Sequence, residues 1–475
     1  MRQNVGRQNP FGGDLNQEGQ DKIRRIKVRH EDKVIGSWVL RLVLVMVLIL
    51  SFALGSGAGV AAEEKAKIEY FSWLAAEVTM GKCIEELVQI FEILNPNVDV
   101  EVQAVTFGDK LPIFLTRSQG GQAPSLSRWT DADMQLLISK GLAADLKPFI
   151  DEEGPGFLDQ WIEGSFDLVI KGDQVFGMPE ENMPVCLVYN QDLYRIAGLD
   201  PDGPPGTREE FLEYAKKLTR DTDGDGKTDQ WGFGMIGAKT PALFLRFDPW
   251  FWGPGGEYIK MTANGPRSAL DTAEALDGFR FFIELYTKHE VVPPGPTSAA
   301  SMDVRRMWVN EMAAMGLGGG FEMGAVSGIN PEWPLTEKLR LAAVPVPAGG
   351  KKVTAGHIGY YALSPECKNP EAAWRFLRFM TNHFAQARMF EYQGFVAGRK
   401  DIVSSYKIQN NNFARVSASE AVYGKFPPQI PEWSEAREYF LVAIQEALTG
   451  VKSPGEALLD AHEEINRLLE RAYGG

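Results

Sequence analysis

The chain has few of the residues that usually build reactive or metal-binding centres. Its 475 residues include three cysteines and five histidines. The cysteines, Cys83, Cys186 and Cys367, are far apart and form no CxxC pair, which argues against a thiolate zinc site and against a disulfide framework. We expect them to be small buried apolar residues. No GxSxG, HExxH or P-loop motif is present, and the histidines show no spacing typical of a triad or a metal site.

Basic residues are also outnumbered, with 49 Lys and Arg against 63 Asp and Glu and a formal net charge of −14. A surface this negative repels phosphate backbones, so we expect no nucleic-acid partner. Apolar residues make up 44% of the chain and charged residues 24%, which is typical of globular proteins. The length allows two or three domains and a sizeable core.

The N-terminal segment has the pattern of a secretory signal peptide. A region rich in Lys and Arg, residues 22–41, precedes a short apolar run, Leu42 to Leu54, and small residues that end at Ala62. A spanning helix needs about 20 residues, so we expect cleavage after Ala62. An uncleaved anchor counted from Ile35 is the alternative. Either way, residues 63–475 are expected in the periplasm or on the extracellular face of the membrane, and no cysteine follows the run to carry a lipid.

The rest of the chain alternates strand and helix patterns, which indicates α/β layers. Residues 68–71 and 98–105 are predicted strands, separated by a helix over 83–94, so this part begins with a βαβ unit. Capping signals predict further helices after Thr207, Asn369 and Ser453. We find no internal repeat.

The segment from Gly177 to Gly234 carries the most specific motif. Tyr189-Asn190 is followed by Asp192-Leu193 and by Ala197-Gly198-Leu199. This series resembles the signature of family 1 extracellular solute-binding proteins, the maltose-binding-protein-like receptors that pass sugars to ABC importers. The similarity continues through residues 308–325, 355–400 and 427–460 and covers nearly all of 63–475. Two positions depart from the family pattern: Pro124 is followed by Ser125 rather than Asp, and Thr207 by Arg208 rather than Trp.

This resemblance implies an α/β, two-lobed periplasmic-binding-protein fold of type II, with discontinuous lobes joined by a multi-strand hinge. The chain would cross between lobes near Glu181, Gly356 and Phe426. We therefore expect an N-terminal lobe of residues 63–182 plus 357–424, and a C-terminal lobe of residues 183–356 plus 425–475. A ligand would bind between the lobes and draw them together by hinge motion.

Aromatic residues are candidates for the ligand site. Flat rings suit the apolar C–H face of a sugar, and carboxylates or amides suit its hydroxyl rim. Trp73 follows an expected strand, and Trp250 and Trp252 stand beside a Pro-Gly-Gly turn. In the family, the positions matching Trp129 and Asp131 often supply an aromatic and an acidic group to the sugar, and relatives often carry a Trp at the position of Phe321. The alternative for each aromatic residue is a place in a hydrophobic core.

The expected crossings supply further candidates, because polar groups there would face the cleft. They are Glu181 and Asn182 at the first crossing, and His357 and Tyr360 after Gly356. The alternative for Glu181 and Asn182 is a solvated hinge loop. No basic motif marks this cleft in the sequence, which argues against a phosphate ligand.

An Asp-rich loop is a candidate metal site. Asp221, Asp223, Asp225 and Asp229 occupy positions 1, 3, 5 and 9 of an EF-hand-type calcium loop, with Gly226 at position 6. Position 12 is Gly232 rather than Glu, so the bidentate ligand is missing. We expect either a structural calcium ion or an exposed Asp-Gly turn, and no cofactor that the function requires.

These observations predict a receptor rather than an enzyme. We expect an exported monomer that binds a mono- or oligosaccharide and presents it to an ABC importer permease. One alternative is a receptor for another polar solute, such as a polyamine or a glycerol phosphate ester. The other is an anchored extracytoplasmic glycoside hydrolase, which needs two carboxyl groups about 5–10 Å apart.

Overall fold

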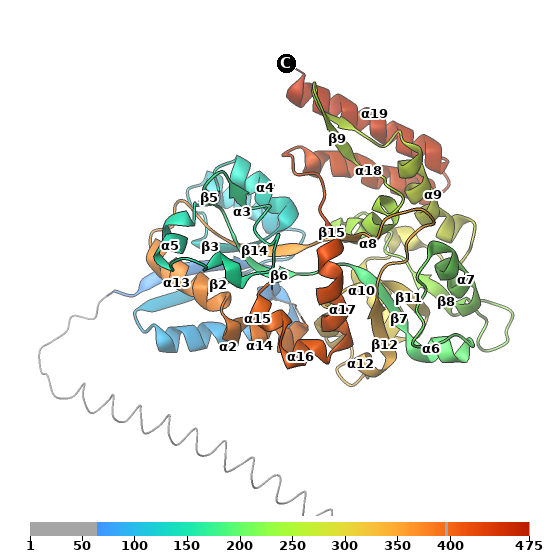
Figure 1. The fold of residues 1–475 in the computed structure, drawn as a ribbon, viewed down its shortest axis with the longest axis horizontal. Coiled ribbons are helices and arrows are strands. Elements are labelled where there is room, and N and C mark those ends of the chain that lie inside the picture. The colour runs from blue at the N-terminus through green and yellow to red at the C-terminus, as the bar shows by residue number, and fades with distance from the viewer. Residues whose placement is uncertain (1–63, 395–397, 475) are drawn as a thin grey trace, which may run out of the picture. The chain divides into compact units, whose positions relative to one another are not determined.

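A computed structural model describes residues 64–394 and 398–474, and these residues build two main sheets (Figure 1), each with a hydrophobic core of its own. We call the part around the first sheet the first lobe and the part around the second sheet the second lobe. The expected signal peptide or anchor, residues 1–62, lies outside the described residues. Within the described ranges, no helix has both the length and the apolar character needed to cross a membrane.

The first lobe is built on a five-stranded sheet. Its strand order is β2-β1-β3-β14-β6, with strands β1 (Ala66–Ser72), β2 (Val98–Ala104), β3 (Leu126–Thr130), β14 (Ile358–Leu363) and β6 (Met178–Asn182). The expected βαβ unit is confirmed, because β1 and β2 pair in parallel. Strand β14 comes from far along the chain and joins β3 to β6, pairing antiparallel with both.

Helices with one apolar face cover this sheet. In α2 (Val78–Leu94), the buried residues recur at the helical spacing of three and four: Met80, Cys83, Ile84, Leu87, Val88 and Phe91. The other helices are α3 (Lys110–Gln119), α4 (Asp131–Ser139), α5 (Lys147–Glu152), α13 (Pro370–Met380) and α14 (His383–Gln393). Helix α13 begins where Asn369-Pro370 predicts, but Asn369 donates to the Lys67 carbonyl (3.1 Å) and makes no side-chain cap.

The second lobe has a four-stranded sheet in the order β12-β7-β11-β8. Its strands are β12 (Leu339–Ala342), β7 (Cys186–Asn190), β11 (Ala313–Gly318) and β8 (Trp231–Gly234). The Tyr189-Asn190 motif ends β7. Asn190 then caps the next helix by accepting from the N–H groups of Asp192 and Leu193. The motif is therefore part of the scaffold, where it turns a buried strand into a helix.

The helices of the second lobe include the two that the capping boxes predict, at Thr207 and Ser453. They are α6 (Gln191–Ile196), α7 (Arg208–Leu218), α8 (Pro241–Trp252), α9 (Ala273–Thr287), α10 (Ser301–Val309), α11 (Glu322–Ser327), α12 (Leu335–Lys338), α18 (Trp433–Leu448) and α19 (Pro454–Tyr473). A hairpin of β9 (Ile259–Thr262) and β10 (Gly265–Ser268) packs beside α19. Cys83 and Cys186 are buried and Cys367 is half-buried; all three are free thiols.

After α14 the chain continues through three further helices, the last of which contacts the second lobe. Short helices α15 (Lys400–Val403) and α16 (Tyr406–Gln409) lead into α17 (Asn412–Glu420). Phe413 and Val416 of α17 lie in the second core, and Asn412 accepts from the Leu341 N–H of β12 at 2.7 Å. The apolar face of α17 therefore belongs to the second lobe.

Three neighbouring segments connect the two lobes. Between β6 and β7, the Met183 N–H donates to the His357 carbonyl at 2.8 Å, and the Val185 N–H donates to the Ala355 carbonyl at 3.0 Å. The pair β13 (Thr354–Ala355) and β15 (Gly424–Lys425) adds the third segment. A side chain at Gly356 would meet the Phe426 ring at 2.9 Å, so any other residue here would require that ring to shift. The predicted two-lobed α/β fold with a multi-strand hinge is confirmed.

The core of the second lobe depends on a cluster of aromatic rings around Phe440 in α18. Its ring lies 5.0–5.7 Å from the rings of Phe244, Phe247, Phe251, Tyr258 and Phe279. We expect Phe440→Ala to lower the free energy of unfolding by about 3–5 kcal/mol, because it leaves a cavity among rings that cannot collapse. Val442→Ala, exposed on the same helix, should change it by less than about 0.5 kcal/mol. Urea unfolding measures both, and equal effects would contradict the packing.

Candidate functional site

A cavity of about 510 Å³ lies between the two lobes. Residues of the first lobe that line it include Trp73, Phe107, Arg128, Glu181 and Gln393; those of the second lobe include Arg246, Arg305 and Phe321. A smaller cavity of about 180 Å³ adjoins it and shares three of its lining residues, Phe107, Leu245 and His357. We call the two cavities together the interlobe cleft.

A buried ion cluster forms the floor of the cleft on the first-lobe side. Arg128 of β3 is bonded through Nε to Glu180 and through Nη2 to Glu181, two neighbouring residues of β6. The Tyr361 hydroxyl of β14 donates to the second oxygen of Glu180. One guanidinium thus faces two carboxylates, which gives the cluster a formal charge of −1. Glu181 is 0% exposed, and its Oε2 has no hydrogen-bond partner among the described residues.

Gly359 makes this cluster possible. A side chain at this position of β14 would meet Arg128 Nη2 at 2.6 Å and Glu181 Oε1 at 2.8 Å. The absence of a Cβ lets the ion cluster lie flat on the sheet. The Arg128 guanidinium also lies 4.1 Å from the Trp73 ring centre, which fixes this ring at the edge of the cleft.

Arginines from two helices and one carboxylate form the opposite wall. Arg246 of α8 contacts Glu322 Oε1 at 3.1 Å, and Arg305 of α10 contacts Glu322 Oε2 at 2.7 Å. Arg246 also donates to the Leu317 carbonyl at 3.4 Å. Burial lowers the pKa of Arg246 to about 10, since the nearby Glu322 offsets the cost of burying this charge only in part. Two arginines therefore line the cleft although no basic motif marks them in the sequence.

The smaller cavity has its own polar groups. His357 Nδ1 lies 2.8 Å from Asp131 Oδ1, and Lys110 is paired with Asp133. Asp248 of α8 accepts a hydrogen bond from the Tyr258 hydroxyl, and burial raises the pKa of this carboxyl well above its usual range. Acidic and basic groups therefore alternate along this end of the cleft.

The structure brings five of the sequence-predicted ligand residues together in the cleft lining: Trp73, Asp131, Glu181, Phe321 and His357. Trp73 directly follows β1, and Phe321 precedes α11. The Arg246 guanidinium lies 5.0 Å from the Phe321 ring centre. The other predicted residues are buried outside this lining: Trp129, Asn182, Trp250, Trp252 and Tyr360.

The buried candidates have partners inside the lobes. Trp129 packs 4.7 Å from Phe114 and donates from Nε1 to the Ser127 hydroxyl at 2.7 Å. The Tyr360 hydroxyl donates to the Ser165 carbonyl at 2.9 Å. Trp250 and Trp252 lie in the second core, because α8 turns them toward the aromatic cluster rather than the cleft. Asn182 stands opposite Ile358 on β6 and is 9% exposed.

Sequence reasoning missed several residues that line the cleft. Arg246, Arg305 and Gln393 stand on three helices, with no common motif around them. Phe107 stands in a turn before α3, 5.4 Å from Trp73. The sequence pattern that could have identified Arg246 is a polar residue on an otherwise apolar stretch of helix, between Phe244 and Phe247. That pattern is too common to identify a site without the fold.

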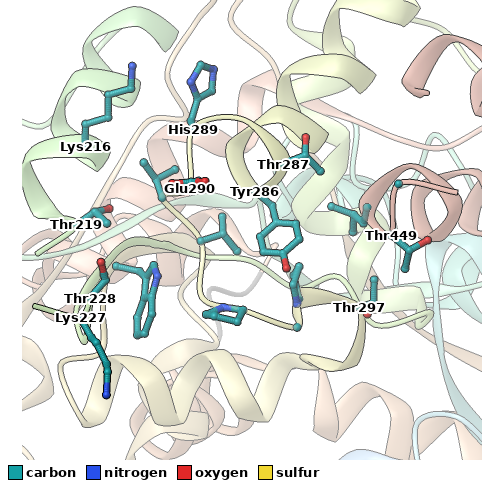
Figure 2. Close-up of a pocket in the computed structure, with 18 residues that line it drawn as sticks. Lys216, Thr219, Lys227, Thr228, Tyr286, Thr287, His289, Glu290, Thr297 and Thr449 are labelled. Carbon is teal, nitrogen blue, oxygen red and sulfur yellow. The ribbon is translucent and has the colours of Figure 1, made fainter. Parts of the chain in front are cut away.

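A larger hollow of about 1060 Å³ lies in the second lobe, away from the cleft (Figure 2). Its labelled residues come from α7 and the loop after it, the end of α9, and the turns at Thr297 and Thr449. Lys216, Lys227, Glu290 and Thr449 are exposed, so water already satisfies these groups. We therefore place the candidate site in the cleft, where charged groups are buried and incompletely paired.

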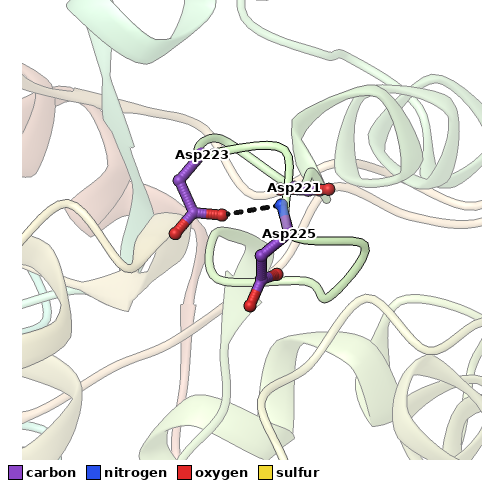
Figure 3. Close-up of side chains that lie close together, drawn as sticks. All are labelled: Asp221, Asp223 and Asp225. Carbon is purple, nitrogen blue, oxygen red and sulfur yellow. Dashed lines mark hydrogen bonds between the residues drawn. The ribbon is translucent and has the colours of Figure 1, made fainter.

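The Asp-rich loop brings three of its four acidic side chains together. Asp221, Asp223 and Asp225 each offer an oxygen within 4.8 Å of the others (Figure 3). Asp221 accepts from the N–H groups of Gly224 (2.6 Å) and Gly226 (2.8 Å), which lowers its pKa. Asp229 instead accepts from the Thr222 hydroxyl at 2.8 Å. The loop therefore places three carboxylates close together, whereas the fourth, Asp229, bonds Thr222.

A charged, aromatic cleft between two α/β lobes joined by three crossing segments defines a ligand-binding protein of the two-lobed type. The model of the bacterial extracellular solute-binding protein family matches residues 75–387. The chain belongs to this family, whose members are exported solute-binding components of ABC transporters. A Brucella abortus (strain 2308) protein described as a binding protein is 23% identical over 401 residues, covering 82% of this chain and 90% of the relative.

A further sequence relative and two solved structures also match this chain, and the solved structures share its fold. The sn-glycerol-3-phosphate-binding periplasmic protein of Escherichia coli (strain K12) is 24% identical over 154 residues, 31% of this chain and 34% of that protein. A Thermotoga lettingae solute-binding protein bound with α-D-tagatose matches with a TM-score of 0.75 and 23% identity, over 86% of this chain and all of that chain. Maltose-bound T. maritima MalE3 has the same TM-score and 20% identity, over 85% of this chain and all of that chain.

The close approach at Gly359 gives a test of the cleft floor. We expect Gly359→Ala to lower the free energy of unfolding by about 2–4 kcal/mol, because the added methyl group displaces a buried ion pair. Gly455→Ala is the matched control, since that position in α19 faces open space and alanine favours a helix. Thermal and urea unfolding measure both variants. If the two glycine variants were equally stable, Arg128 and Glu181 would not lie over Gly359 as described.

Proposed function

We propose that this solute-binding protein is an extracytoplasmic receptor that binds a carbohydrate in the interlobe cleft and delivers it to the permease of an ABC importer. The observation that carries the proposal is the cleft lining, in which the rings of Trp73, Phe107 and Phe321 stand beside the polar groups of Glu181 and His357. Aromatic faces suit the C–H surface of a sugar, and buried polar groups suit its hydroxyls. The receptor itself performs no chemistry.

The sugars held by solved relatives, tagatose and maltose, are consistent with this ligand class. A glycerol phosphate ester is the second candidate, favoured by Arg246 and Arg305 and by the similarity to glycerol-3-phosphate-binding proteins. A polyamine fits less well, because a cationic ligand would meet two arginines on one wall. The hinge at Met183, Gly356 and Lys425 supplies the motion that would close the lobes on the ligand.

A screen of mono- and oligosaccharides by melting temperature tests the proposal. We expect a sugar that binds to raise the melting temperature, by an amount that grows with the logarithm of its concentration over Kd. Phe107→Ala should weaken the binding of that sugar by about 10-fold, because the contact with the ring is lost. Phe384→Ala is the control, because both phenylalanines are exposed, at 39% and 45%, and Phe384 lies outside the cleft lining. Equal loss in both variants would refute a sugar site against Phe107.

The same incubations separate a receptor from a hydrolase. After prolonged contact with the purified protein, chromatography should recover each oligosaccharide unchanged. Released products that disappear in Asp131→Asn or Asp248→Asn would support the glycoside hydrolase alternative, because both carboxyl groups line the smaller cavity.

We further propose that the Asp-rich loop binds a structural calcium ion through Asp221, Asp223 and Asp225. Three carboxylates held together on one side of a tight loop form an oxygen site suited to a hard cation. The missing twelfth-position Glu and the engagement of Asp229 by Thr222 favour weak, extracellular-type affinity, on the order of 0.1–1 mM.

Calcium addition and chelation test this second proposal. We expect millimolar CaCl₂ to raise the melting temperature of the wild type, and EDTA to reverse the change. Asp223→Ala should abolish the response, because it removes a ligand while leaving the Asp221 bonds to the loop backbone. Asp202→Ala, in an exposed loop nearby in sequence, should respond like the wild type. A melting temperature that is insensitive to both reagents would rule the calcium site out.

A further inference from the structure

The two walls of the interlobe cleft carry formal charges of opposite sign. On the first lobe, one guanidinium, Arg128, faces the carboxylates of Glu180 and Glu181. On the second lobe, two guanidiniums, Arg246 and Arg305, share the single carboxylate of Glu322. The first group therefore sums to −1 and the second to +1. Both groups are largely buried. Charges interact more strongly in the protein interior than in water, because its dielectric constant is lower.

Each wall also presents an open hydrogen-bonding atom. Glu181 Oε2 is buried and unpartnered, and its residue lines the larger cavity. It can accept a hydrogen bond and cannot donate one while ionised. On the other wall, both oxygens of Glu322 are already engaged by the two arginines. The two guanidiniums therefore share one carboxylate.

The second-lobe wall is short of negative charge. Arg246 is 6% exposed and uses Nη2 for Glu322 and Nε for the Leu317 carbonyl, and no hydrogen bond of its Nη1 is found among the described residues. Arg305 uses Nε for Glu322 and contacts the Met302 sulfur at 3.6 Å. Guanidinium groups in this state favour a planar or tetrahedral oxyanion that accepts two hydrogen bonds.

We infer that the cleft selects an acidic carbohydrate, whose hydroxyl groups face Glu181 and whose carboxylate or phosphate group binds Arg246 and Arg305. This inference rests on the proposed carbohydrate function and narrows it to one chemical class. A neutral sugar would leave one positive charge of the arginine pair without a counterion, because Glu322 supplies a single carboxylate. A polyamine would add a third cation beside the pair. Glu77, exposed at the first-lobe rim and bonded to Gln393 at 2.7 Å, adds negative charge only on the opposite wall.

Inorganic phosphate is the first probe, because it needs no sugar stereochemistry to fit. At constant ionic strength, we expect phosphate to raise the melting temperature of the full chain compared with chloride, by an amount that grows with the logarithm of the phosphate concentration over Kd. Arg305→Gln should weaken this binding at least about 10-fold, through loss of a charge-assisted bond. Arg306→Gln is the matched control, because Arg306 is the next residue of α10 and its exposed side chain bonds Asp303 instead. No stabilisation by phosphate beyond that by chloride, or equal effects of the two variants, overturns the inference.

Sugars matched in all but charge form the second arm. D-glucuronate and glucose 6-phosphate are compared with D-glucose, and each other acidic sugar with its neutral parent. The inference is supported if the acidic sugars bind more tightly than their neutral parents, and if this preference is lost in Arg305→Gln and retained in Arg306→Gln. Whether the sugar carboxylates or the sugar phosphates bind more tightly then identifies the anionic group. If neutral parents bind better throughout, the inference fails and the carbohydrate receptor stands. If no sugar binds while phosphate still depends on Arg305, the anion site stands and the carbohydrate function fails.

Discussion

The buried bonds of Arg128 to Glu180 and Glu181 are the interaction on which the rest of the site depends. They tie β3 to β6, and Tyr361 adds β14, so the cluster spans the three strands that end beneath the cleft. Buried ion clusters of this kind contribute little net stability, since desolvation offsets much of the attraction. Their effect here is positional. The cluster holds Trp73 by a cation–π contact and fixes β6 where the chain begins its first crossing to the second lobe.

The crossing segments place this floor on one side of the proposed hinge. The Met183 N–H donates to the His357 carbonyl and the Gly356 N–H donates to the Lys425 carbonyl, so the amides of the neighbouring segments are paired with one another. The opposite wall forms one unit with α8, α10 and α11, because Arg246 and Arg305 both bond Glu322 across these helices. The proposed closure would bring two preformed charged groups toward a ligand, rather than assemble either group from separate parts.

The sequence predicted the scaffold better than the site, for a physical reason. Caps and periodic apolar faces are local, so Thr207, Ser453 and the βαβ unit could be identified from neighbouring residues alone. Cleft residues depend on which way a helix or strand faces in the folded chain. Trp73 and Trp129 both stand near strand ends, yet one lines the cleft and the other packs against Phe114. Arg246 and Arg305 meet only through Glu322, which no spacing rule connects.

The position of β14 has a consequence for how the chain matures. All four strands of the second sheet are present once residue 342 has been made, whereas β6 has no neighbour in its sheet until residues 358–363 follow. The sheet that starts first along the chain is thus the last to be completed. As the chain is synthesised, the partner strand of β6 is therefore made only after all four strands of the second sheet. The order of translation and the order of completion are reversed.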